Sequence, residues 1–451
     1  MGARAHDSAR PAGHEPGDDG HRGHGARGID GWSPSLRREV VRIQALAREA
    51  GLDFAPIDFR MLDAQQVNGV AAYGGFPVRY PSWRFGMEFE RLEKSRQYGL
   101  SRIYELVINT DPVVAYLVRT NSHLEQKLVI AHVCGHADFF RHNSWFSATD
   151  RGMLARMGEH AAEVRAAMER EGQEQVECFL DTLLSLETLI DPYLPLRARL
   201  GADVDATPRA PTYDVLGFLC EHAPLARWKR DLARLVRREA YYFQPQRTTK
   251  IMNEGWASFW HARLLTSGVL EDGEVVEFAD CHSGATAEAP GRINPYKLGI
   301  RLFRSAEERG LDLFRLRRVH NDASLIDELV DAEFVERERL FLYGTNPKTG
   351  RAEVVERDPR RVKARLLSDL AWGGLPQIEL VGAGDGTDRT LELVHHHDGR
   401  DLELEAAKAT LVCAARLWGG PVVLATREGG EPRRIRAHRG EAEILDGESA
   451  A

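Results

Sequence analysis

Cysteine, long apolar runs and an excess of basic charge are all scarce in this 451-residue sequence. Its five cysteines are scattered, odd in number and never spaced as CxxC, which predicts neither a disulfide framework nor a thiolate zinc site. No apolar run is long enough to span a bilayer, and the N-terminus lacks the apolar segment of a signal peptide. The net charge of −8 provides no dominant basic face and argues against nucleic acid as a partner. We therefore expect a cytoplasmic protein without a membrane span.

Composition divides the chain into two folded parts and two tails. Residues 1–31 are rich in Gly, His, Asp and Arg and have almost no large apolar side chains, which predicts a disordered tail. Helical periodicity dominates residues 32–374 and predicts a large, mainly helical core domain. Residues 375–445 alternate apolar and polar side chains around one helical segment, which predicts a small α+β module, and 446–451 should form a second disordered tail. The expected fold class is α+β, mainly α.

Local patterns predict the individual elements of the large domain and of the small module. In the first third of the chain we expect helices over 35–51, 58–69 and 85–98, an aromatic loop over 73–86, a strand over 102–109 and helix almost throughout 113–143. Further on, we expect helices over 213–220, 226–242 and 248–265, and strands over 376–381, 390–396 and 421–426.

Two histidines in the predicted helix over 113–143 are the main candidates for a functional site. His132 and His136 are four residues apart, so their imidazoles lie about 40° apart on one face and can bind one metal ion together. The residues around them are apolar, so a hydrogen-bonded pair of core histidines is the alternative. Glu254 is the best third ligand, because the neighbouring Gly255 lets another backbone approach. His261 lies on nearly the same face as Glu254, either as a fourth ligand or as a hydrogen-bond partner of a ligand.

The residues around these positions resemble the gluzincin metallopeptidases, in which a HExGH helix supplies two zinc histidines and a later helix supplies a glutamate. His132, His136 and Glu254 match those three positions, within Ala131–His136 and Asn253–Trp260. The resemblance implies one zinc ion and a zincin-like fold for the large domain. Val133, however, stands where these enzymes carry the catalytic glutamate, and an apolar side chain cannot take up a proton.

Several other polar residues on the histidine helix are candidates for the remaining roles. Glu125 and His142 are weak candidates for a substitute base. His123 and Asp138, like His261, are candidates for a fourth ligand or for a group that hydrogen-bonds a ligand. Each of them also has an ordinary surface or structural explanation. A di-iron centre would need paired Glu-x-x-His helices, and neither motif has that spacing.

Over most of its length the sequence is similar to the SpoVR family, which comprises stage V sporulation protein R and its relatives. Four stretches carry the resemblance: Gln126–Phe140, Thr249–His261, Asn294–Gly299 and Trp418–Leu424. Membership implies a cytoplasmic protein linked to spore cortex formation or to the stress response. It also implies association with a PrkA-type serine protein kinase and a von Willebrand A-like protein. Two activities remain open, a metal-dependent amide hydrolase with a non-standard base and a non-catalytic scaffold or pseudoenzyme that works with the kinase system.

Overall fold

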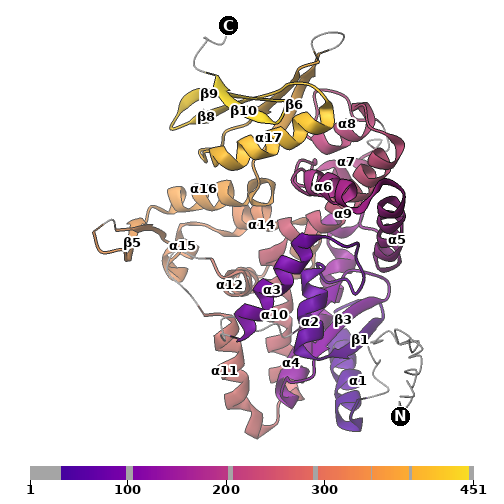
Figure 1. Ribbon diagram of the computed structural model, residues 1–451. Helices are drawn as coiled ribbons and strands as arrows, with labels where there is room; N and C mark the ends of the chain where they lie inside the picture. Colours follow the sequence, from indigo (N-terminus) through magenta and orange to yellow (C-terminus); the bar gives the residue numbers. More distant parts are fainter. Residues whose placement is uncertain are drawn as a thin grey trace, which may run out of the picture.

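The computed structural model describes residues 32–97, 105–201, 207–287, 293–346, 348–384 and 389–445. Helices predominate over strands in these residues, and the strands gather in three separate sheets, which confirms the predicted α+β, mainly α class. Figure 1 shows the largest sheet at one end of the molecule and the N-terminal helix α1 near the other. Among the described helices, none combines the length and the apolar character needed to cross a membrane. The two predicted disordered tails lie outside the described residues.

A three-stranded sheet and four helices form the first part of the chain. Strand β3 is central, parallel to β1 and antiparallel to β2. In chain order these elements are α1 (Pro34–Glu49), β1 (Ile57–Leu62), α2 (Ala64–Ala72), α3 (Trp83–Gln97), β2 (Glu105–Ile108), β3 (Val113–Val118) and α4 (His123–His142).

Strands β1 and β3 correct the sequence prediction, which placed both within helices. All six residues of β3 are buried, and successive side chains pack into two different hydrophobic clusters on the two faces of the sheet. A strand covered on both faces shows no alternation of apolar and polar residues, so its sequence resembles that of a buried helix. In the stretch 58–69, the chain leaves β1 at Leu62, and the Asp63 side chain caps the start of α2.

A long helical region follows and ends in a two-stranded hairpin, β4–β5, and a final helix, α16. Its helices are α5 (Met153–Glu171), α6 (Gln173–Leu184), α7 (Leu194–Arg199), α8 (Val215–His222), α9 (Arg227–Thr248), α10 (Lys250–Leu264), α11 (Val275–Ala285), α12 (Pro295–Glu308), α13 (Leu313–Val319), α14 (Asp322–Leu329), α15 (Ala332–Glu338) and α16 (Pro359–Leu370). The hairpin strands are β4 (Leu342–Thr345) and β5 (Ala352–Glu356).

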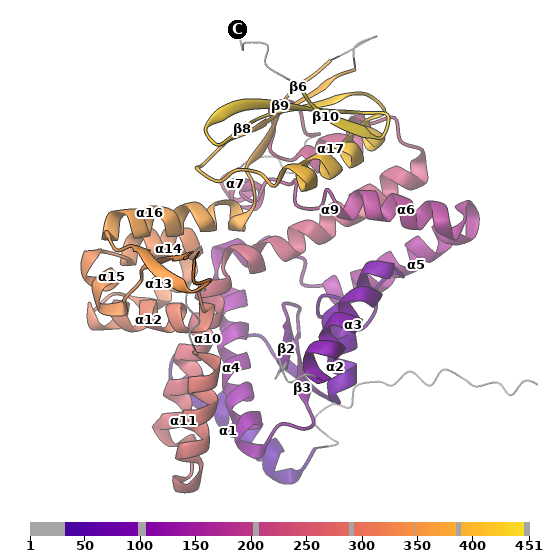
Figure 2. The same ribbon diagram turned by 60° about the vertical axis from the view of Figure 1, so that its left-hand side comes forward.

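The C-terminal part is a five-stranded sheet of order β10-β9-β8-β7-β6 with one helix packed on it. Its elements are β6 (Ile378–Ala383), β7 (Leu391–His395), α17 (Leu404–Trp418), β8 (Val422–Glu428), β9 (Glu431–His438) and β10 (Glu441–Leu445). Helix α17 connects β7 to its parallel neighbour β8. The inner face of this sheet shares one hydrophobic cluster with α6, α8 and α9, so the C-terminal part packs directly on the helical part (Figure 2).

Helix α10 is packed between α4 and α12, and glycines set how closely the three helices approach. A Cβ on Gly135 of α4 would lie 2.6 Å from Cα of Ala257 in α10. On the other side of α10, a Cβ on Gly255 would lie 2.3 Å from Cα of Gly299 in α12. Real side chains cannot approach a backbone this closely, so the glycines allow α10 to lie against both neighbours. The prediction that Gly255 admits another backbone agrees with this packing.

Candidate metal centre

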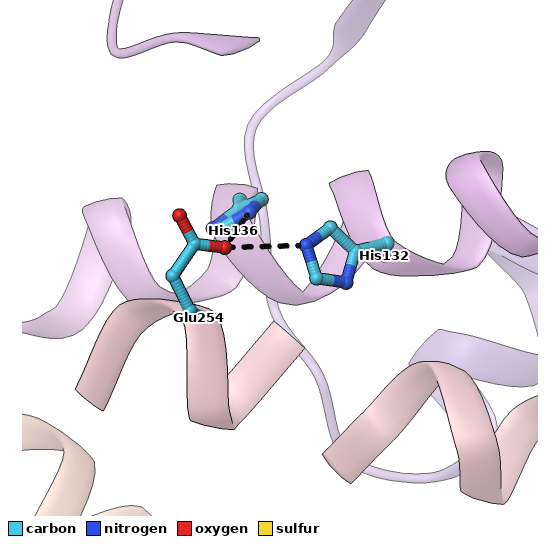
Figure 3. A group of neighbouring side chains, drawn as sticks. All are labelled: His132, His136 and Glu254. Carbon is cyan, nitrogen blue, oxygen red and sulfur yellow. Dashed lines mark ion pairs between the residues drawn. The ribbon is translucent and has the colours of Figure 1, made fainter. Parts of the chain in front are cut away.

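His132 and His136 from α4 meet Glu254 from α10 at the contact between these two helices. Their ligand atoms all lie within 4.8 Å of one another (Figure 3). The Nε2 atoms of both histidines are 3.6 Å from Oε2 of Glu254. Both imidazoles are almost completely buried, because α4 is covered by protein along nearly its whole length. The structure therefore brings together the three side chains that the sequence singled out.

Two atoms of this cluster are buried and have no hydrogen-bond partner. They are Nε2 of His132 and Oε2 of Glu254, and their separation of 3.6 Å is too long for a hydrogen bond. Buried polar atoms in folded proteins are nearly always paired, so two unpaired atoms that face each other need a physical explanation. A cation between them would satisfy both. Two imidazoles and one carboxylate also match the donor set of a zinc ion with one open position.

Hydrogen bonds on the far side of each imidazole leave the Nε2 atoms free. Nδ1 of His136 lies 2.8 Å from Oδ1 of Asn253, an acceptor, so Nδ1 carries the proton. Nδ1 of His132 lies 2.9 Å from Nδ1 of His261, whose Nε2 lies 3.2 Å from Nδ1 of His282. If each ring in this chain donates to the next, His132 carries its proton on Nδ1 and presents a bare Nε2 to Glu254. His261 thus lies behind His132 as its hydrogen-bond partner, outside the group of converging ligand atoms.

The electrostatics of the cluster favour one positive charge at the point where the ligand atoms meet. Burial opposes protonation of His132, but the carboxylates of Glu254 and Glu105 outweigh it and raise the pKa of this imidazole. Burial and the charge on His132 lower the pKa of His136 to about 4. Burial would raise the pKa of Glu254, but the two histidines outweigh this effect and lower it. A bound cation would supply the positive charge that His132 otherwise carries.

Two further residues beside the cluster were not predicted from the sequence. Glu105, on β2, places Oε1 3.8 Å from Nε2 of His132, and burial raises the pKa of its carboxyl. Tyr296, on α12, stacks on His132 with ring centroids 6.1 Å apart. Burial and the nearby carboxylate of Glu254 raise the pKa of Tyr296. Tyr296 falls within Asn294–Gly299, a stretch already noted for its family resemblance. Glu105 is a single glutamate in a predicted strand, and no sequence pattern marks it as a site residue.

Glu125 and His123 lie at the start of α4, away from the cluster. Glu125 and the N-cap residue Ser122 form a reciprocal capping box, in which each side chain accepts from the other's backbone N–H. His123 is exposed at the first position of the helix, roughly 13 Å along the axis from His132. Neither side chain reaches the three ligands.

Asp138 and His142 belong to a separate network beyond the C-terminal side of the cluster. Asp138 is completely buried, accepts a hydrogen bond from Nε1 of Trp256 at 2.8 Å and pairs with the guanidinium of Arg317. It also accepts from the backbone N–H of Asp53. Nε2 of His142 lies 3.0 Å from the carbonyl oxygen of Asp53. These contacts join α4 to α10, to α13 and to the loop after α1.

A cavity of about 650 Å³ lies beside the cluster. His136 and Glu254 line it together with Glu105 and Tyr296. Its remaining walls come from β2, α4, the loop before α3, the segment after α6, helices α9 and α10, and Leu375. The cluster is therefore open to molecules larger than water on one side and enclosed by helices on the other.

The comparisons with known proteins agree with the sequence resemblance. Residues 32–205 and 195–375 match the family described as SpoVR like protein, and residues 376–429 match the SpoVR-like C-terminal domain. The uncharacterized protein YcgB of Escherichia coli (strain K12) is 29% identical over 463 aligned positions, which cover 86% of this chain and 90% of YcgB. No solved structure matches, so the zincin-like description of the large domain stays a prediction. Because the family matches extend over most of the sequence, the chain belongs to the SpoVR family.

Proposed function

We propose that His132, His136 and Glu254 bind one zinc ion and that the protein is a metal-dependent hydrolase of amide bonds. The observation that carries the proposal is the pair of buried, unpaired atoms, Nε2 of His132 and Oε2 of Glu254, in a cluster whose members His136 and Glu254 line an open cavity. Zinc is the ion that best fits two imidazoles and one carboxylate. When bound, zinc polarises a carbonyl group and lowers the pKa of a water molecule.

In this proposal, Glu105 takes the role of the glutamate that Val133 replaces. Val133 is fully buried in the hydrophobic core and cannot exchange a proton. The carboxylate of Glu105 instead lies at the cavity, next to His132. In the metal-free protein, burial raises the pKa of this carboxyl. Glu105 accepts a proton from water in the cavity and returns it to the departing amine.

Metal analysis of the purified protein tests the ligand assignment. We expect about one zinc per chain, and we expect His132→Ala and Glu254→Gln each to lose it. The control is His395→Ala, which removes a buried histidine that is hydrogen-bonded to Thr426 in the C-terminal sheet. Retention of zinc in both ligand variants would refute the assignment. Glu105→Gln separates binding from chemistry, because it should keep zinc and lose hydrolysis of short peptides.

A second candidate function is a non-catalytic scaffold, and Val133 is the observation that favours it. In that case zinc would hold α4 and α10 together, and the wild-type protein would bind the ion without hydrolysing any amide. Zinc-loaded wild-type protein that is inactive on a broad panel of peptides, and equal in this respect to Glu105→Gln, would support the scaffold over the hydrolase.

For either function, we propose a cytoplasmic role in sporulation, through spore cortex formation, or in the stress response. We also propose that a PrkA-type serine protein kinase and a von Willebrand A-like protein are its functional partners. Membership of the SpoVR family supports these assignments. Co-purification of tagged wild-type protein with the two partners, compared with the His132→Ala variant, tests both the association and its dependence on the metal. Absence of both partners from the wild-type sample would contradict it.

A further inference from the structure

Three cationic side chains line the cavity beside the metal cluster and have no part in the proposed zinc site. They come from the loop before α3, from the end of α9 and from the start of α10, and they are Arg79, Arg247 and Lys250. The lining also holds three carboxylates, those of Glu105, Glu187 and Glu254. The formal charges of these groups cancel, and Glu239, which pairs with Arg79, adds one negative charge, so a divalent ion on the cluster leaves the cavity with an excess of one positive charge. Such a cavity attracts anions.

The three cations differ in whether they already form ion pairs with other residues. Arg247 and Lys250 are exposed, and within the described parts of the chain neither has a salt-bridge partner. Arg79 is almost buried and forms an ion pair of 2.6 Å with Glu239, yet its Nε is a buried donor without a hydrogen-bond partner. A buried donor left unpaired costs free energy unless something fills the site. Among the described residues of the lining, Arg247 and Lys250 are therefore exposed cations without a salt bridge, and Arg79 keeps one buried donor without a hydrogen-bond partner.

The spacing on α10 relates these cations to the metal cluster. Lys250 precedes Glu254 by four residues, so both face the same side of the helix, about 6 Å apart along its axis. An extended peptide advances about 3.3–3.6 Å per residue. A group bound at Lys250 is therefore one or two residues away from a group held at Glu254. Arg247 stands three residues before Lys250, at the end of α9, and lines the same cavity.

We infer that this cavity binds the terminal carboxylate of a peptide and places an amide one or two residues before it at the metal cluster. The inference rests on the proposed hydrolase and specifies its substrate class. A carboxylate fits because arginine binds it through two parallel N–H···O bonds, and lysine adds a point charge. Hydrolysis there consumes one water: the amide C–N bond breaks, the acyl carbon gains the hydroxyl, and the amine gains the proton. The smaller product is a free amino acid or a dipeptide.

A matched pair of probes tests the carboxylate site. N-acetyl-alanyl-alanine and its C-terminal carboxamide differ only in the charged terminus, and isothermal titration of the full-length Glu105→Gln protein measures both without hydrolysis. We expect the acid to bind about tenfold more tightly than the amide, because a charged hydrogen bond is lost in the amide. The L,L and D,D forms of the acid distinguish ordinary peptides from the D-terminated peptides of bacterial cell walls.

Two double variants connect the preference to the named cations. Arg247→Gln with Lys250→Gln should remove the preference for the acid and leave the zinc content unchanged. Arg91→Gln with Lys94→Gln removes the same charge from exposed positions on α3 outside this cavity, and should keep the preference.

Zinc content is measured on every sample, so the two proposals fail separately. Equal binding of acid and amide by zinc-loaded protein would overturn the carboxylate site and leave the metal assignment intact. A preference that survives the cavity double variant but disappears in His132→Ala would also overturn it, because the metal would then hold the carboxylate. A preference in zinc-free protein that the cavity double variant removes would support the carboxylate site while the zinc site fails.

Discussion

Replacing His261 with phenylalanine should weaken zinc binding, although His261 is not among the converging ligands. The imidazole of His261 is buried and lies between His132 and His282. Phenylalanine fills a similar volume but accepts no hydrogen bond. The proton on Nδ1 of His132 then has no acceptor, and the alternative tautomer, with the proton on Nε2, becomes more favourable. A proton on Nε2 occupies the lone pair that a metal would use, so binding must first move it.

The expected loss of zinc affinity follows from the role of the His132–His261 hydrogen bond in orienting His132. Removing a group that orients a metal-bound histidine typically costs 10–100-fold in metal affinity, or about 1.4–2.7 kcal/mol. The Nδ1–Nδ1 distance of 2.9 Å indicates a well-formed bond, and both rings are buried, so we expect a loss well within this range for His261→Phe. His282 is only half-buried and contacts His132 through His261 alone, so His282→Ala should have a smaller effect.

Competition with a chelating dye measures the zinc affinity of each variant, and circular dichroism checks that the helices remain. His395→Phe is the matched control, because His395 is also a buried, hydrogen-bonded histidine but lies in the C-terminal sheet. Wild-type affinity in a folded His261→Phe protein would refute the orienting role. An equal loss in His395→Phe would show that the effect is general destabilisation instead.

Four further perturbations follow from the same geometry. Asp138→Asn should lower the free energy of unfolding in urea by about 3–5 kcal/mol, because the buried guanidinium of Arg317 loses its counter-charge. A change below about 1 kcal/mol, which is typical of an exposed ion pair, would contradict this. Gly255→Ala changes no ligand but should reduce the zinc content, because the new methyl group forces α10 away from α12. Full zinc occupancy in this variant would argue against the prediction. Val133→Glu should lower the free energy of unfolding by a similar amount, about 3–5 kcal/mol, because it puts an unpaired carboxylate in the core, and it should not restore hydrolysis. A stable and more active variant would contradict this. In chelator-treated protein, His136 alone should lower the free energy of unfolding by about 3 kcal/mol as the pH falls from about 6.5 to about 4. The pKa of His136 is about 4 when folded and about 6.5 when unfolded, so unfolding takes up a proton, and the lowered pKa of His261 acts in the same direction. A flat urea profile between pH 7 and pH 5 would exclude it.

The sequence was sufficient to find the three candidate ligands because their signal is local. The spacing of His132 and His136 fixes one face of a helix whatever surrounds it, and Glu254 stands next to a glycine that marks a close helix contact. No comparable local sequence pattern identifies Glu105. Its position beside His132 depends on the pairing of β2 with β3 and on the packing of that sheet against α4, and only the folded chain shows it.

The errors in the predicted elements have the same origin. Strand β3 was predicted as helix because tertiary burial on both faces removes the alternation that identifies a strand. The C-terminal strands β6, β7 and β8 were predicted because turn residues flank them. Strands β9 and β10 were not predicted, and exposed charged residues alternate with the buried ones in β9. Local pattern was therefore least informative for β3, which is buried on both faces, and it also missed β9 although that strand alternates.

The proposed base, Glu105, lies on a strand and not on the histidine helix, which changes what must hold the site together. In a HExGH helix, the two histidine ligands and the base share one rigid element, so the geometry among these three is fixed by helical spacing alone. In this chain Glu105 comes from β2, His132 and His136 from α4, and Glu254 from α10. Three contacts must then be correct at once: β2 on β3, the sheet on α4, and α4 on α10. The close glycine contacts of α10 and the buried Asp138 network hold the last of these. A shift between α4 and α10 would separate Glu254 from the two histidines without unfolding either helix, so the proposed metal site depends on this helix contact.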